Sequence, residues 1–138
     1  MLSYKITNSK GATLIEVMGT IMVFMIGISA LLGVFYASGA MAKRAQYAYT
    51  AYNIAKNHVE DLRAFSFSDL AVANETASVV DQNGVDDPTG QYIRTTTITT
   101  SYNSDASLTK IDVQVWYVLR GVQSQTPMQL TTVIFQNG

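Results

Sequence analysis

The sequence predicts an α+β fold in which one long N-terminal helix packs on a small antiparallel sheet of three to four strands. Three observations lead to this expectation. Residues 17–42 form an apolar run of 26 residues without a single charge. A stripe of apolar residues at helical spacing follows the run, and three β-rich segments close the chain. A length of 138 residues leaves room for one small domain beside the apolar run.

The run 17–42 is long enough to cross a bilayer. A transmembrane helix needs about 20 apolar residues, and at ~1.5 Å per residue this run would extend roughly 39 Å. Two lysines precede it, and Lys43 and Arg44 follow it, so the charge rule for flanking loops gives no orientation. Glu16 stands at its start. A carboxylate at the edge of hydrocarbon is costly without a partner, which makes Glu16 a candidate functional residue.

Small residues mark one face of this membrane segment. Ser29, Gly33 and Ala37 are four residues apart, so they share a helical face. Small residues at this spacing let helices approach closely in lipid. We therefore expect this face to pack against other helices, although tolerance of glycine in a membrane helix accounts for the same residues.

The helix is expected to continue beyond the membrane segment, from about residue 13 to about residue 65. Its second half carries an apolar stripe in steps of three and four, made up of Ala45, Ala48, Tyr52, Ala55, Val59 and Leu62. Such a stripe needs a cover in water, and the C-terminal sheet is the candidate. We expect the sheet to cover Tyr52, Val59, Leu62 and Phe65.

The signal for regular structure is weak over residues 66–91. Residues 68–71, Ser-Asp-Leu-Ala, are suited to capping a short helical turn. Residues 81–88 form a turn cluster by composition. This cluster resembles part of a calcium loop, whose candidate ligands are Asp81, Asn83, Asp86 and Asp87. The third alternate position is Val85, which offers no oxygen ligand, so a solvated acidic turn is the interpretation that we prefer.

Three β-signals follow. Residues 92–100 are rich in Thr and Ile, residues 111–119 alternate in polarity, and residues 130–135 are apolar. Residues 103–105 and 121–127 read as the connections between them. Short connections between consecutive strands favour an antiparallel meander.

The composition offers little for catalysis or cofactor binding. No cysteine is present, and His58 is the one histidine, so thiolate and histidine-cluster metal sites are excluded. Asp86 and Asp87 are adjacent in a turn and do not face each other as a catalytic pair does. No phosphate loop or nucleophile elbow occurs. We expect no enzyme and no cofactor, and the formal charge of −1 gives no basic patch for nucleic acid.

The N-terminus resembles the prepilin and pseudopilin signal of the type IV pilin family. The resemblance rests on a short basic leader, Gly11, and then Ala-Thr-Leu-Ile-Glu-Val at residues 12–17, opening the apolar run. In that family a membrane peptidase cuts after the glycine and methylates the new N-terminus. The resemblance implies cleavage between Gly11 and Ala12, methylation of Ala12, and a role for Glu16 in filament assembly. The family usually has Phe where this chain has Ala12.

The resemblance also implies the domain plan and the function. Residues 1–11 would be the removed leader, 12–42 the transmembrane and assembly helix, and 43–138 a pilin-like globular region outside the cytoplasm. Without the leader the formal charge is −3. The expected function is that of a minor structural subunit of a type IV pilus, held in the inner membrane before assembly. The expected partners are other pilin subunits, the prepilin peptidase and methyltransferase, and inner-membrane lipid.

Alternatives to this function remain. The chain also fits a minor pseudopilin of a type II secretion or DNA-uptake machine. A different class is a stand-alone membrane-anchored binding domain in which Glu16 is incidental, although a plain anchor does not need the Gly-x-Thr-Leu-Ile-Glu motif. A membrane-bound enzyme is the third class, and the sequence contains no candidate residues for it.

Overall fold

The computed structural model describes residue 11 and residues 13–136. The chain divides into two compact units, Met1–Met41 and Ala42–Gly138. Helix α1 (Leu14–Arg63) begins in the first unit and ends in the second. The layout is α+β and pilin-like, as predicted, with one long apolar N-terminal helix and a curled antiparallel sheet.

The described part of the first unit consists of Gly11, Thr13 and the N-terminal part of α1. Its residues are all exposed, because no other element of this unit covers them. Helix α1 is long and apolar enough to cross a membrane by length and composition. This is compatible with a single-pass membrane anchor. The predicted helix over residues 13–65 is confirmed to within two residues at each end.

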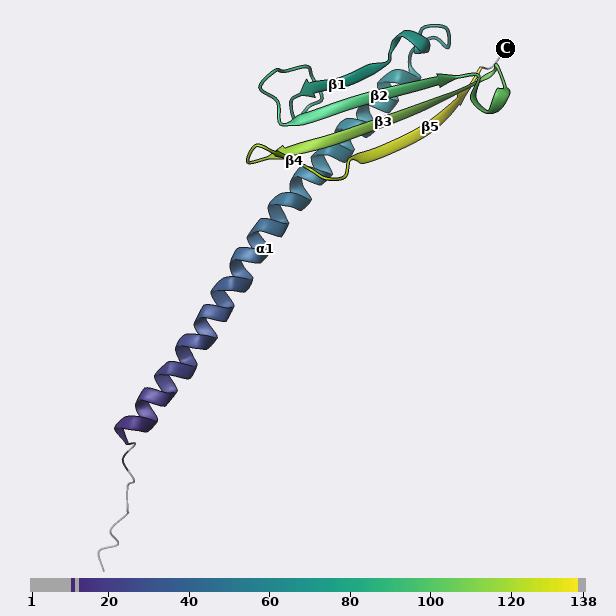
Figure 1. Ribbon diagram of the computed structural model, residues 1–138. Helices are drawn as coiled ribbons and strands as arrows, with labels where there is room; N and C mark the ends of the chain where they lie inside the picture. The colour runs from purple at the N-terminus through teal and green to yellow at the C-terminus, as the bar shows by residue number, and fades with distance from the viewer. Residues whose placement is uncertain (1–10, 12, 137–138) are drawn as a thin grey trace, which may run out of the picture. The chain divides into compact units, whose positions relative to one another are not determined.

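In the second unit, the C-terminal part of α1 lies against one face of the sheet (Figure 1). Its buried side chains fall at helical spacing, and they are Ala51, Ile54, Ala55, Val59 and Leu62. The predicted cover of Val59 and Leu62 is therefore confirmed. The predicted cover of Tyr52 and Phe65 is wrong, since these side chains are 44% and 51% exposed.

The contact face of α1 is rotated relative to the predicted stripe because Ala51 and Ile54 replace Tyr52 at its centre. Ala51 is fully buried and Ile54 is 2% exposed, so these two side chains belong to the contact face. Tyr52, the next residue in the helix, points away from the centre of this face and is 44% exposed. The stripe also begins later than expected, since Ala45 is exposed.

The sheet has five antiparallel strands, β1 (Glu75–Val80), β2 (Tyr92–Thr100), β3 (Leu108–Leu119), β4 (Val122–Gln123) and β5 (Met128–Phe135). Strand β3 is central. It pairs with β2 along most of its length, with β5 from Leu108 to Val115, and with β4 at Val118 and Leu119. Strands β1 and β5 therefore form the two long edges (Figure 1). Two short 3-10 helices, η1 (Leu70–Val72) and η2 (Tyr102–Ser104), lie in connections.

The three predicted strands correspond to β2, β3 and β5. Strand β2 has the predicted bounds, whereas β3 begins three residues earlier and β5 two residues earlier. Strands β1 and β4 were not predicted. The antiparallel pairing of β1 with β2 is interrupted between Glu75 and Ser78, where Ala77 has a φ of 51°. This bulge breaks the period of two that would mark a strand in the sequence.

The core of the second unit lies between α1 and the inner face of the sheet. Strand β3 supplies Ile111, Val113 and Val115, each fully buried, and Leu70 of η1 closes one end. Alternate residues of β3 point to the opposite face, which accounts for its regular burial pattern. On that outer face, Asp112 accepts hydrogen bonds from Gln129 and Thr131 of β5.

A two-residue turn joins β3 to β4. Arg120 and Gly121 form it, with φ values of 55° and 77°. Positive φ at both central residues is the geometry of a type I′ hairpin turn, in which the second position favours Gly. The residues predicted as a connection thus include a tight hairpin and strand β4.

Candidate functional site

The residues of the N-terminal motif lie at the start of α1. Gly11 is exposed, and no atom of the other described residues lies within 4 Å of the position that a Cβ would take there. Ala12, the predicted cleavage and methylation residue, lies outside the described residues. The Thr13 carbonyl accepts hydrogen bonds from the backbone N–H groups of Glu16 and Val17, at 3.0 and 3.2 Å. These bonds close the first turn of the helix immediately after the predicted cleavage position.

Glu16 is exposed in the first turn of α1. Within the part of the chain that the structure describes, its carboxylate makes no ion pair. A carboxylate at a helix N-terminus gains about 0.3–1 kcal/mol from the helix dipole. That gain is smaller than the cost of leaving the charge in hydrocarbon. The described part of the chain thus offers no cation to the Glu16 carboxylate.

The predicted packing face of α1 is open along its length. Ser29, Gly33 and Ala37 are all exposed. The hydroxyl of Ser29 donates to the carbonyl of Met25 at 2.9 Å, so it is satisfied within its own helix. Apart from the adjoining backbone of its own helix, no atom of the described residues lies within 4 Å of the position that a Cβ would take at Gly33. The described part of the chain thus offers nothing that covers this face.

A buried polar cluster, which was not predicted from the sequence, lies on the sheet beneath α1. Arg94 on β2 is 7% exposed. Its Nε and Nη2 donate to the two carboxylate oxygens of Glu75 at 2.7 and 2.9 Å, and its Nη1 donates to the Gly84 carbonyl at 2.7 Å. Asp86 lies 3.5 Å from Nη2. The guanidinium thus ties β1, β2 and the loop between them.

His58 on α1 completes the cluster. Its Nε2 lies 3.8 Å from Oε2 of Glu75, beyond hydrogen-bond range, and has no hydrogen-bond partner in the described residues. Burial lowers the pKa of His58, and the nearby Arg94 lowers it further, against smaller opposing effects of Glu75 and two aspartates. The imidazole is therefore neutral at pH 7, and its approach to Glu75 is a packing contact rather than an ion pair.

Glu75 stays ionised in this cluster. Partial burial by itself would raise the pKa of Glu75, but hydrogen bonds from Arg94 and Ser78 and the charge of Arg94 outweigh it, so the pKa is lowered. The cluster holds an arginine that donates three hydrogen bonds, an ionised carboxylate and a neutral imidazole, without a nucleophile beside a base. Its chemistry is that of a structural clamp between β1, β2 and the loop that joins them, and His58 of α1 packs against it.

The acidic loop between β1 and β2 uses its oxygens internally. One oxygen of Asp81 accepts the backbone N–H groups of Asn83 and Val85, at 2.8 and 2.9 Å. These bonds, that of Val85 first, lower the pKa of Asp81. Asp87 accepts from both the backbone and the hydroxyl of Thr89, each at 2.8 Å. Among the described residues, no group of three or more acidic, histidine or cysteine side chains is placed to hold a metal ion.

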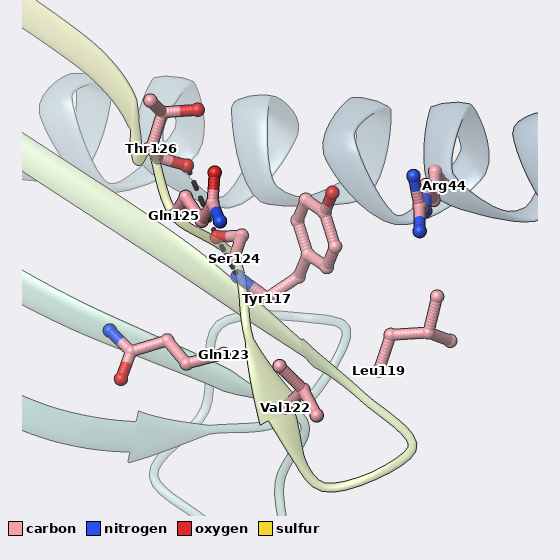
Figure 2. Close-up of a pocket in the computed structure, with 8 residues that line it drawn as sticks. All are labelled: Arg44, Tyr117, Leu119, Val122, Gln123, Ser124, Gln125 and Thr126. Atoms are coloured by element: carbon pink, nitrogen blue, oxygen red, sulfur yellow. Dashed lines mark hydrogen bonds between the residues drawn. The ribbon is translucent and has the colours of Figure 1, made fainter.

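A hollow of about 390 Å³ lies where α1 enters the second unit. Arg44 on α1 forms one wall, Tyr117 and Leu119 on β3 form another, and residues 122–126 close the third (Figure 2). Ser124 fixes this last segment, because its backbone N–H donates to the Tyr117 carbonyl at 2.8 Å and its hydroxyl donates to the Thr126 carbonyl at 3.1 Å. We call this hollow the Arg44 pocket.

One signal for the buried cluster was present in the sequence. Arg94 occupies an inward position in the alternation of residues 92–100, between Tyr92 and Thr96. A cation at an inward position of a strand requires a buried carboxylate partner. That requirement predicts an acidic residue on a neighbouring element, although it does not identify Glu75, whose strand gives no β-signal.

Comparison with protein-family models, with curated proteins and with solved structures finds no match. The class of protein is therefore defined by the architecture of the chain alone. That class is an α+β protein of pilin-like layout, whose long apolar N-terminal helix is compatible with a membrane anchor.

Proposed function

We propose that this chain is a minor structural subunit of a type IV pilus, which waits in the inner membrane and then joins a helical filament. One observation carries the proposal. The carboxylate of Glu16 has no ion-pair partner in the described chain and stands at the head of a helix whose following residues, as far as Met41, are all exposed. Together with Gly11, it matches the prepilin signal at every position except the first after the cut.

The proposed sequence of events begins with removal of the leader. Cleavage after Gly11 frees an α-amine on Ala12, which is cationic at neutral pH. This amine lies four residues before Glu16 in the chain. While the subunit is in the membrane, both groups remain near the headgroups, where hydration keeps the cost of each charge small.

Assembly changes the surroundings of both charges. In a filament core built from packed apolar helices, the dielectric constant is low and each charge needs an opposite partner. The Glu16 carboxylate of one subunit then pairs with the Ala12 amine of its neighbour, which neutralises both groups and fixes the axial register. The small-residue face at Ser29, Gly33 and Ala37 allows the close helix contacts that such a core requires.

The same observations support a second function, that of a minor pseudopilin in a type II secretion or DNA-uptake machine. In that function Glu16 would pair with the N-terminal amine of a neighbouring subunit in the same way. The proposal places the helix in the inner membrane and the second unit outside the cytoplasm. Its partners are other pilin subunits, the prepilin peptidase and methyltransferase, and lipid.

The test is the replacement Glu16→Val, expressed with the assembly machinery. The membrane should retain this variant, since valine removes a charge from the edge of hydrocarbon. The variant should be cleaved as the parent is, but it should be absent from sheared filaments and should not pull down partner subunits.

The matched control is Thr20→Val, which removes a polar group one turn further along α1. The hydroxyl of Thr20 donates to the Glu16 carbonyl at 2.8 Å, so this change leaves the carboxylate in place. Thr20→Val should enter filaments at the parental level. If Glu16→Val entered filaments at the parental level, Glu16 would act only at the N-terminus of its own helix, and the proposed role would be wrong.

A further inference from the structure

Negative charge is distributed unevenly in the second unit. Residues 42–59 and 113–136 contain no aspartate or glutamate, although the whole chain has ten. The basic residues of these two stretches are Lys43, Arg44, Lys56 and Arg120. Overall the chain is slightly acidic, so the surface formed by these two stretches differs in sign from the rest of the molecule.

The two stretches meet at the Arg44 pocket. Arg44 comes from the first stretch, and the other lining residues come from the second. Within the described residues, Lys43, Arg44 and Arg120 form no ion pair with any carboxylate. The guanidinium of Arg44 thus faces an open hollow without an internal anion (Figure 2).

The walls of the pocket combine polar and apolar groups. Gln123, Gln125 and Thr126 supply amide and hydroxyl groups, while Leu119 and Val122 supply an apolar rim. Val122 is 70% exposed next to the type I′ turn. An exposed apolar side chain beside cations is the chemistry of a surface that lies at the boundary between headgroups and acyl chains.

The position of Arg44 in the chain adds a second argument. It follows Ala42, the last residue of the uncharged run, by only two positions. In a chain anchored by that run, the guanidinium of Arg44 lies at headgroup level, where long basic side chains extend toward phosphate groups. The planar guanidinium is also well matched to two phosphate oxygens at once.

We propose that the Arg44 pocket binds the phosphate of an anionic phospholipid headgroup in the leaflet from which α1 emerges. This inference requires only that α1 is anchored in a membrane, and it holds whether or not the protein assembles into a filament. The occupant is a lipid rather than a free anion, because the pocket offers a single guanidinium and an apolar rim.

The test uses the full chain in lipid nanodiscs, in which the membrane composition is controlled. One disc contains phosphatidylcholine alone, and the other contains phosphatidylcholine with phosphatidylglycerol. Hydrogen exchange of the backbone amides of residues 119–126 is measured in both. We expect exchange there to be about fivefold slower in the anionic disc, the factor that one cation at an anionic surface provides.

Two variants locate the effect. Arg44→Gln should lose the lipid-dependent protection, whereas Lys56→Gln, which removes an exposed cation further along the same helix, should keep it. Exchange at Ile111, Val113 and Val115, which are buried in β3, reports in each sample whether the second unit is folded.

Three results would overturn the inference. The first is equal exchange of residues 119–126 in the two discs for the parent chain, which requires no variant to fold. The second is retention of the protection in Arg44→Gln. The third is the same protection in neutral discs after addition of inorganic phosphate, which would identify a site for free anions instead of lipid.

Discussion

At the scale of single residues, Arg94 connects three parts of the second unit through three hydrogen bonds. Its guanidinium is held by the carboxylate of Glu75 and the carbonyl of Gly84. Removing one partner of a buried charged pair leaves the other charge uncompensated, which is costly. The cluster therefore specifies how β1 and its loop lie on β2, a region in which the strand itself is irregular.

The neutral His58 in this cluster makes stability depend on pH. The groups that face it are Glu75 from β1, Arg94 from β2, Asp61 from its own helix, and Asp86 from the loop. Its folded-state pKa is lowered from 6.5, so the unfolded chain binds a proton at a higher pH than the native chain does. The stability that His58 contributes is complete above about pH 6.5 and is lost as the pH falls below it.

The prediction is that thermal unfolding of the second unit, followed by near-ultraviolet circular dichroism, shifts to lower temperature between pH 7 and pH 5. The pKa of Glu75 is lowered from 4.5, so its titration acts mainly below pH 5 and contributes little in this window. His58→Gln should remove most of the pH dependence, because glutamine does not titrate. An unchanged pH slope in His58→Gln would show that another group is responsible.

At the scale of elements, the contact between α1 and the sheet depends on a few buried side chains. Leu62 is 2% exposed and Val59 is 1% exposed, at the C-terminal end of the stripe. Fully burying one such side chain contributes about 1.5–3 kcal/mol relative to exposure. The helix surface on the other side is solvated, as Lys56 illustrates by its exposure.

The prediction for this contact is that Leu62→Asp lowers the free energy of unfolding of the second unit by about 3 kcal/mol or more, since it buries an unpaired charge. The full chain in detergent micelles is suitable, because near-ultraviolet circular dichroism of Trp116 and the tyrosines reports on the second unit. Lys56→Ala should cost under about 1 kcal/mol. If Leu62→Asp melted at the same temperature as the parent, as Lys56→Ala nearly should, the contact face that we give to α1 would be wrong.

The bounds of a helix or strand could be predicted closely from the sequence where the element is regular. The long helix and strand β2 follow simple periods, so their bounds were predicted closely. Strand β1 was missed because of its bulge at Ala77, and the identity of the helix face was shifted because Ala51 and Tyr52 are both apolar. The spacing of apolar residues shows that a helix has an apolar face. Which of two neighbouring apolar residues is buried depends on packing against the rest of the fold.

The Arg44 pocket and the buried cluster depend on tertiary contacts. Arg44 and Ser124 are 80 positions apart in the chain, and only the folded hairpin brings them to one hollow. Glu75 and Arg94 meet because β1 pairs with β2. In contrast, Gly11 and Glu16 belong to one short motif in the sequence. They could therefore be named as candidate site residues without a structure.

At the scale of the whole molecule, the two compact units correspond to two kinds of surface. The described part of the first unit exposes an apolar helix with one carboxylate at its head. The second unit, Ala42–Gly138, has its own core. On the proposed function, the first unit supplies membrane retention and assembly, and the second presents a folded surface outside the membrane.

The last prediction concerns processing of the whole chain. The proposed function requires a peptidase to cut between Gly11 and Ala12 before any assembly occurs. Intact-mass measurement of the membrane fraction, in a host that has a prepilin peptidase, should give a protein that starts at Ala12, with or without one methyl group. Gly11→Val should remain uncut, because a branched side chain at the scissile position blocks close approach of the peptidase to the backbone.

The Glu16→Val variant is the control for this measurement, since it should be cut normally and fail only at the later step. The two variants thus separate processing from assembly. Gly11→Val should accumulate with its leader in the membrane, whereas Glu16→Val should accumulate there without it. A parent protein that still begins at Met1 in the presence of the peptidase would contradict the proposed function, whereas the proposed lipid contact at Arg44 would remain open to its own test.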